Sequence, residues 1–238
     1  MNRTIFCIVV GTSLLVSCQK DADFPDVDPT FELSEYQREI VSYFQEIALG
    51  FEFGSASKIT RKWVDTMQIF IGGMPSPELL LELDKIISEI NELASDHFAI
   101  SQVQDSLESN FYVFFGSGDE YAAIFPALSD LVKSNWGLFS IQYNSAAELN
   151  GGYMYVDIYR ANVTEQKHLL REELTQSLGL GNDSSRYDDS IFQSRWTSTN
   201  RYAAIDEELI RLLYHPEMTV GLDQLEVREV LTQILINE

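Results

Sequence analysis

Helical and strand-like hydrophobic patterns alternate along this chain, and the alternation narrows the fold that it can adopt. The clearest helical pattern opens at Pro75-Ser76-Pro77 and runs to about Leu93, with apolar residues at every third or fourth position. A second helix is expected from Thr164 to Leu178, where Gly179 stops it. A helix with one apolar face must pack on a sheet or on another helix. The chain is therefore expected to form an α/β or α+β domain.

The same patterns predict the other elements and their order. Further helices are expected at Glu35 to Leu49, Asp206 to Leu213 and Asp223 to Leu235, and strands at Asp65 to Ile71, Phe98 to Gln102, Asn110 to Phe115, Leu138 to Tyr143 and Tyr153 to Tyr159. The polar connection Asn144 to Gly152 suits a hairpin. Gly116-Ser117-Gly118 has no lysine and no helix signature after it, so a phosphate loop is not expected. This order predicts a mixed sheet with packed helices and a helical C-terminal part, in one domain over residues 34–238.

Charge excludes one class of partner. The 238 residues include 37 Asp and Glu but only 16 Lys and Arg, which gives a formal net charge of −21. Binding to nucleic acid needs a basic face that neutralises phosphates, so no nucleic-acid partner is expected.

The first residues are typical of an export signal. Arg3 precedes an apolar run from Ile5 to Val16, which is too short to span a bilayer. The run ends in Leu15-Val16-Ser17-Cys18, which resembles the lipobox of bacterial lipoproteins. That resemblance implies a signal peptide over residues 1–17, cleavage before Cys18 and a lipid anchor on its sulfur. A plain secretory signal with an incidental cysteine is the alternative.

The residues after Cys18 extend this interpretation to a location. Residues 18–33 are acidic and contain two prolines, so they are expected to form a solvated tether. Gln19 stands where Asp is linked to retention in the inner membrane, which favours the outer membrane of a bacterial cell envelope. The start Gln19-Lys20-Asp21 also resembles an export signal of surface lipoproteins, which implies exposure on the cell surface.

One internal segment carries a specific motif. It reads Arg171-Glu172-Glu173-Leu174-Thr175-Gln176-Ser177-Leu178-Gly179-Leu180-Gly181-Asn182-Asp183. Leu170, Leu174 and Leu178 form the buried stripe of a helix, and Glu172 and Gln176 stand one above the other on the adjacent face. The helix ends at Gly179, beyond which Asn182 is expected to return towards Glu173 and Gln176.

This spacing is similar to the zinc helix of the metzincin peptidases, in which two His four residues apart flank a Glu and a third His follows a turn Gly. In that register the His positions fall on Glu172, Gln176 and Asn182, and the catalytic Glu falls on Glu173. The approach to Met218 resembles the metzincin Met-turn. The chain also resembles a bacterial family of unknown function that looks like degenerate metzincins. The resemblance implies a zincin-like fold from which all three metal-binding His residues are missing.

The available ligands argue against catalytic zinc. Zinc prefers imidazole or thiolate, whereas Gln and Asn are poor ligands, and an acylated Cys18 offers no thiolate. An alternative set of His168, Glu172 and His215 depends on where His215 points. The loop after Asn182 is rich in the oxygen ligands that calcium prefers, but its spacing does not match an EF-hand and Asx-turns account for it. No cofactor is therefore expected.

Three functions remain open. The first is a zinc-free binding protein for a peptide, a protein or a glycan, whose polar site at the metzincin metal position consists of Glu172, Glu173, Gln176, Asn182 and Asp183. The second is an active hydrolase in which Glu173 is the general base. The third is a structural envelope lipoprotein without a ligand cleft. The missing His residues favour the first, so the chain is expected not to be an enzyme.

Replacing Cys18 with Ser tests the lipobox. The variant lacks the sulfur that would carry the lipid, so it should appear as a soluble protein with an uncleaved or differently cleaved signal. Cell fractionation followed by immunoblotting measures this. A Ser variant that stays in the membrane fraction like the wild type would contradict the lipid anchor.

Overall fold

A mixed sheet is the scaffold of the domain in the computed structural model, which describes residues 32–52 and 56–238. Its strands are β1 (Lys62–Trp63), β2 (Met67–Gly73), β3 (Ile100–Val103), β4 (Phe111–Gly116), β5 (Gly137–Tyr143) and β6 (Glu148–Asp157). Neighbours in the order β1-β6-β4-β2-β3 are parallel, and β5 is antiparallel to β6. The predicted signal peptide, Cys18 and the tether as far as residue 31 lie outside the described residues.

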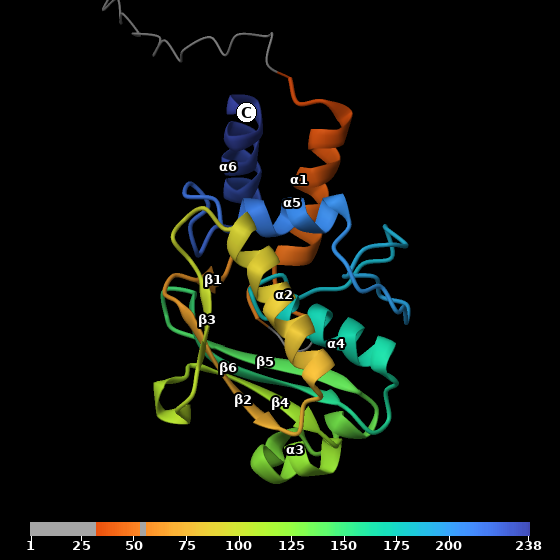
Figure 1. Cartoon of the computed structure of the whole chain (residues 1–238). Helices are drawn as coiled ribbons and strands as arrows, with labels where there is room; N and C mark the ends of the chain where they lie inside the picture. Colours follow the sequence, from red (N-terminus) through yellow and green to blue (C-terminus); the bar gives the residue numbers. More distant parts are fainter. Residues whose placement is uncertain (1–31, 53–55) are drawn as a thin grey trace, which may run out of the picture. The chain divides into compact units, whose positions relative to one another are not determined.

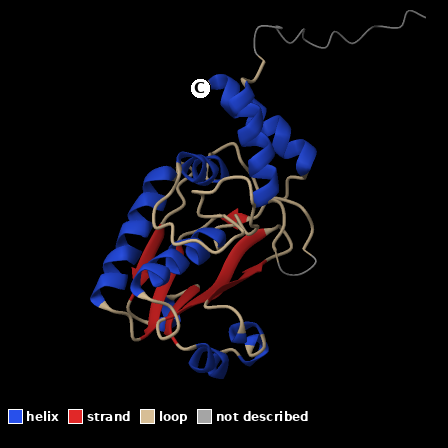
Figure 2. Cartoon of the chain, turned by 90° about the vertical axis from the view of Figure 1, so that its right-hand side faces the viewer, coloured by secondary structure: helices blue, strands red, loops and turns tan. Residues whose placement is uncertain are grey.

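Six α-helices of the described residues pack around this sheet. They are α1 (Glu35–Ala48), α2 (Pro77–Leu93), α3 (Gly118–Ile124), α4 (Val163–Gln176), α5 (Ala204–Leu213) and α6 (Gln224–Asn237). Helices α2 and α4 cover one face of the sheet, while α1, α5 and α6 pack together beyond one end of it (Figure 1). Figure 2 shows strands and helices as separate layers. The predicted mixed sheet with packed helices and a helical C-terminal part is confirmed. None of the helices in the described ranges is long and apolar enough to cross a membrane.

The two faces of the sheet carry different cores, because side chains alternate along a strand. On the side of α2 and α4, Phe111, Val113 and Phe115 of β4 join the main hydrophobic core. On the other side, Phe114 stacks with Tyr121 of α3 in a smaller aromatic cluster. The main core holds α4 against the sheet, and the smaller one holds α3 and the segment that leads into β5.

Helix α4 is buried on almost every side. Its predicted apolar stripe of Leu170, Leu174 and Leu178 has no exposed surface. Arg171, which is also fully buried, binds Glu82 at 3.0 Å and contacts Glu89, both on α2. A buried charge that lost its partner would cost about 3–5 kcal/mol. The stripe and this ion pair therefore set the rotation of α4 about its axis and the direction of its remaining side chains.

The expectation that no helix follows Gly116-Ser117-Gly118 is wrong. Helix α3 begins at Gly118, and Ser117 is its N-cap. The Ser117 hydroxyl accepts the N–H of Glu120, and the Glu120 carboxylate accepts the N–H of Ser117. This capping box is a helix signal in its own right, but a helix of seven residues is too short to add a convincing hydrophobic period.

Strand β6 differs from its predicted range at both ends. It begins at Glu148 rather than Tyr153, because its first two residues pair with the short strand β1, which hydrophobic periodicity does not reveal. It ends at Asp157, whose carboxylate accepts the N–H groups of Tyr159 and Arg160 and turns the chain. Both differences arise from contacts that a pattern along the sequence does not contain.

Leu174→Ala should lower the free energy of unfolding by about 2–5 kcal/mol, the usual cost of truncating a buried Leu. Urea denaturation measures the change. Leu81→Ala is the matched control, because Leu81 is 69% exposed on α2 and its truncation should cost less than about 0.5 kcal/mol. An equally small loss for Leu174→Ala would contradict the packing of α4 in the core.

Candidate functional site

A cavity of about 580 Å³ lies between α4, the start of β5 and the loop around residues 193–196, and we call it the α4–β5 cavity. Four of the five residues predicted for the polar site line it, namely Glu172, Glu173, Gln176 and Asp183. The exception is Asn182. Trp136 and Phe139 form part of the wall opposite α4, and Trp196 belongs to the loop.

Glu173 is the most buried acid in this cavity. Its side chain is 8% exposed, and its carboxylate accepts the backbone N–H of Phe139 in β5. The charges that most raise its pKa are those of other acids, Glu172, Asp183 and Glu52. Burial, reinforced by repulsion from these acids, raises the pKa of Glu173 well above its usual range. The carboxyl group of Glu173 therefore keeps its proton to a higher pH than an ordinary Glu does, unless a cation lies beside it.

Asp183 meets Gln176 at the edge of the cavity. The Gln176 Nε2 group donates to Asp183 Oδ1 at 2.6 Å. Burial, together with the charges of Glu172 and Glu52, raises the pKa of Asp183 to about 7, although the bond from Gln176 opposes the shift. Burial and the charge of Glu172 also raise the pKa of Glu52. The cavity thus gathers carboxyl groups whose ionised forms disfavour one another.

Asn182 does not converge with Glu173 and Gln176 as the sequence suggested. Its Nδ2 group donates to the carbonyls of Glu46, Ile47 and Leu49 at 3.1–3.3 Å, where α1 ends. Gly179 has a φ of +113°, and a Cβ there would lie 2.0 Å from the carbonyl oxygen of Arg61. The turn therefore passes against Arg61, just before β1, and Asn182 contacts the end of α1, while Asp183 lies beside Gln176.

The two candidate histidines lie apart. His168 is buried on α4, where its Nδ1 lies 2.7 Å from the Thr199 carbonyl and its Nε2 lies 3.3 Å from Glu172. Burial alone would lower the pKa of His168, but the hydrogen bond and charge of Glu172, together with the Thr199 carbonyl, give a net rise. His215 is not part of the cavity lining, and its Nδ1 accepts the N–H of Glu217 in its own turn.

The three side chains that the sequence resemblance assigns to zinc ligands, Glu172, Gln176 and Asn182, do not converge on one point. His168 Nδ1 lies against the Thr199 carbonyl and its Nε2 lies beside Glu172, while His215, the other candidate ligand, is elsewhere. Across residues 32–52 and 56–238, no three His, Cys, Asp or Glu side chains form a group that could hold a metal ion. Met218 is fully buried in the main core, and the neighbouring Tyr214 donates to the Leu178 carbonyl at 2.9 Å. The Met-turn-like segment therefore supports the end of α4.

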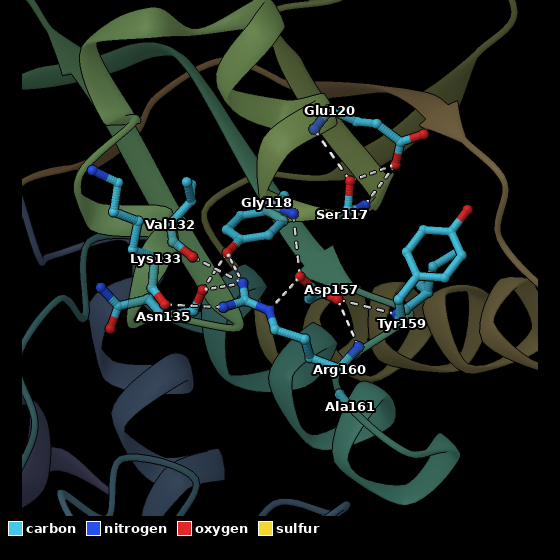
Figure 3. A network of polar contacts seen from close by, with 12 residues as sticks. Ser117, Gly118, Glu120, Val132, Lys133, Asn135, Asp157, Tyr159, Arg160 and Ala161 are labelled. Atoms are coloured by element: carbon cyan, nitrogen blue, oxygen red, sulfur yellow. Dashed lines mark hydrogen bonds and ion pairs between the residues drawn. The ribbon is translucent and has the colours of Figure 1, made fainter.

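An ion pair outside the cavity holds its far wall in place (Figure 3). Asp157, at the end of β6, binds Arg160 at 2.7 Å and also accepts the N–H of Gly118. The Arg160 guanidinium in turn donates to the carbonyls of Val132, Lys133 and Asn135 at 2.9–3.2 Å. These bonds fasten the segment before β5, which brings Asn135 and Trp136 to the cavity.

Sequence reasoning missed three residues of this site. Trp136 and Trp196 line the cavity with their ring centroids 5.5 Å apart and an interplanar angle of 77°, and Glu52 lines it from beyond the end of α1. An isolated Trp in a polar loop, such as Trp196, is the one signal that the sequence offers. Trp196 is 58% exposed, and an exposed Trp beside polar groups is typical of binding surfaces.

The raised pKa of Asp183 predicts how stability depends on pH. Between about pH 4 and pH 7 the folded chain keeps a proton on Asp183 that the unfolded chain has lost, so the stability from this group falls as the pH rises through that window. Asp183→Asn keeps the oxygen that accepts from Gln176 and removes the charge. We expect Asp183→Asn to be more stable than the wild type at about pH 8, with the difference shrinking towards about pH 4.

Thermal unfolding at several pH values measures this difference. Glu229→Gln, on the exposed surface of α6, is the control and should leave the pH dependence unchanged. A stability difference for Asp183→Asn that stays constant with pH would contradict the burial of this carboxyl group.

Comparison with known proteins assigns this chain to a family. No curated protein matches the chain. The solved structure of myroilysin is similar with a TM-score of 0.37 and 14% sequence identity, covering 64% of this chain and 82% of that one. Residues 37–233 match the model of a family described as "Protein of unknown function (DUF2927)". The match covers most of the chain and includes all of its described helices and strands except the first residues of α1 and the last residues of α6. The chain therefore belongs to the DUF2927 family.

Proposed function

We propose that this chain is a lipid-anchored protein of the bacterial cell envelope that binds a peptide or protein ligand in the α4–β5 cavity and does not hydrolyse it. The anchor rests on the lipobox-like segment that ends at Cys18, and the metzincin-like assignment rests on the motif of residues 171–183. The observation that carries the proposal is the arrangement at the three positions where a metzincin would have His.

Three ligands of a catalytic zinc must point at one metal ion. Here Glu172 and Gln176 face the cavity, whereas the side chain of Asn182 is bound to the backbone at the end of α1. A general base at Glu173 would need a metal-bound water, and these side chains offer no ligand set to hold one. The same polar groups instead suit the recognition of a ligand's own polar groups, which supports binding over hydrolysis.

The edge of the sheet favours an extended peptide as the ligand. Among the described strands β5 pairs only with β6, so its outer edge retains free backbone donors and acceptors. The Phe139 N–H on this edge is directed to Glu173, so the edge runs along the cavity. A second, mostly apolar cavity of about 380 Å³, which also includes Phe139, continues past Ile141 and Tyr143 of the same strand. A peptide added alongside β5 would direct its alternate side chains into these two spaces.

The purified domain should contain no stoichiometric zinc and should cleave no peptide, and Glu173→Gln should leave both results unchanged. Elemental analysis measures the zinc, and a fluorogenic peptide library with and without a chelator measures cleavage. Stoichiometric zinc, together with cleavage that chelation and Glu173→Gln both abolish, would overturn the proposal in favour of the hydrolase.

A second experiment tests peptide binding with a matched pair of variants. A Cβ on Gly137 would lie 2.6 Å from Glu173 Oε1, so Gly137→Ala should narrow the cavity and weaken binding of peptides selected from a displayed random library by about tenfold or more. Gly151→Ala on β6 meets only the flexible Gln142 side chain at 3.1 Å and should bind like the wild type. Equal binding by both variants would place the peptide site elsewhere.

A further inference from the structure

We infer that the ligand group recognised in the α4–β5 cavity is an organic cation, the ammonium or guanidinium group of a basic side chain. This inference rests on the proposed binding function and names the chemistry of its ligand. Three features of the cavity support it: its unbalanced charge, a buried carboxyl group without a cationic partner, and the arrangement of its aromatic walls.

The lining of the cavity carries more acid than its own bases balance. Five carboxyl groups line it, those of Glu52, Glu165, Glu172, Glu173 and Asp183. Glu165 closes the capping box at the start of α4, and Glu172 faces His168. The one Lys or Arg among the described lining residues is Arg195, whose guanidinium contacts Asp188. Glu173 is repelled by Glu172, Asp183 and Glu52, whereas Asp183 also has His168 nearby and Glu52 is exposed to solvent.

Two buried charged residues of α4 differ in whether the protein supplies a partner of opposite charge. Arg171 is buried and has two carboxylates, from Glu82 and Glu89. Glu173 is only two residues away and almost as deeply buried, yet its bond to the Phe139 N–H uses one of about four acceptor positions on the carboxylate. Glu173 also lines the cavity, so a ligand that enters it can reach this carboxylate. A cation placed there would give Glu173 what Arg171 already has.

The aromatic walls suit the same kind of group. Trp136 and Trp196 stand nearly perpendicular, and Trp196 is likewise nearly perpendicular to the His168 ring at 6.1 Å. The face of an indole ring attracts cations, and the Arg160 guanidinium already lies 6.0 Å from the centre of Trp136. Trp196, which is exposed at the cavity, has no such cation in the described residues. The cavity therefore joins an available indole to uncompensated carboxylates.

Other ligand chemistries leave these groups unbalanced. The hydroxyl groups of a neutral sugar would fill the space and accept or donate hydrogen bonds, but they would bring no charge to Glu173, Asp183 and Glu52. A small metal ion would need several of the carboxylates to converge, and in the described residues no group of three does so. A basic side chain carries its charge on a long apolar stem and matches both the acids and the indole.

The probes are four blocked tripeptides and one sugar, each measured with the full mature chain. Acetyl-Ala-Lys-Ala-amide and acetyl-Ala-Arg-Ala-amide carry the cation, the Gln and Glu analogues serve as neutral and acidic matches, and chitotetraose represents a glycan. Calorimetry at low salt gives the affinity. Trp fluorescence reports on the site, because Trp63 is fully buried while Trp136 and Trp196 line the cavity.

The Lys and Arg peptides should bind at least about tenfold more tightly than the Gln peptide, and added salt should weaken them. Glu173→Gln and Trp196→Leu should each remove about tenfold of that preference, and Glu229→Gln on the surface of α6 should remove none. Because Glu173→Gln changes a buried site, Asp183→Asn provides a second, less buried test. Near-ultraviolet circular dichroism confirms that each variant is folded.

Equal or tighter binding of the Gln peptide or of chitotetraose overturns the cation inference, and so does a lack of any binding by the Lys and Arg peptides at about 10 mM. Equal binding of basic and neutral peptides leaves the proposed peptide-binding function standing. Zinc-dependent cleavage would instead remove the proposed function, while the ratio of Lys to Gln affinity still decides the cation preference.

Discussion

The cost of burying charge controls how this domain is built around α4. The helix is surrounded by protein, so its charged residues either find a partner within the fold or leave an unmet electrostatic demand. Arg171 satisfies that demand through Glu82 and Glu89 of α2, which locks the helix to its neighbour. Glu173 points to the opposite side, where the protein supplies a backbone N–H and otherwise more acid. One helix thus serves both as a structural anchor and as the floor of a cavity.

The wall opposite α4 depends on a different interaction. Strand β5 is joined to the sheet on one side only, and the segment before it has little regular structure of its own. The Asp157–Arg160 pair compensates, since the guanidinium gathers three backbone carbonyls of that segment and the carboxylate fixes the start of α3 (Figure 3). Trp136 therefore reaches the cavity from a segment that is already fixed in place. A wall that is fixed before a ligand arrives loses little conformational entropy on binding.

The metzincin-like motif takes a different role in this arrangement. Its helix, its glycine turn and its Met218 segment all support the region around the end of α4, and these are the parts that packing requires. The positions that the resemblance assigns to metal ligands make other contacts in this fold. Asn182 has become a clasp for α1, and Gln176 binds Asp183.

The sequence by itself determined the elements with long hydrophobic periods and the burial of Leu170, Leu174 and Leu178, because those patterns express which side must avoid water. It also placed Glu172, Glu173 and Gln176 on neighbouring sides of one helix, since helix geometry is local.

Helix α3, strand β1 and the limits of β6 depended on capping or strand pairing, which hydrophobic patterns in such short segments do not reveal. Only the tertiary structure decided that Asn182 leaves the site, that Asp183 rather than Asn182 pairs with Gln176, and that Trp136, Trp196 and Glu52 complete it. Those positions depend on where segments that are distant in the sequence meet. The turn at Gly179 is an example, because its direction is set by the backbone of Arg61, which packs against Gly179. No spacing along the chain encodes that contact.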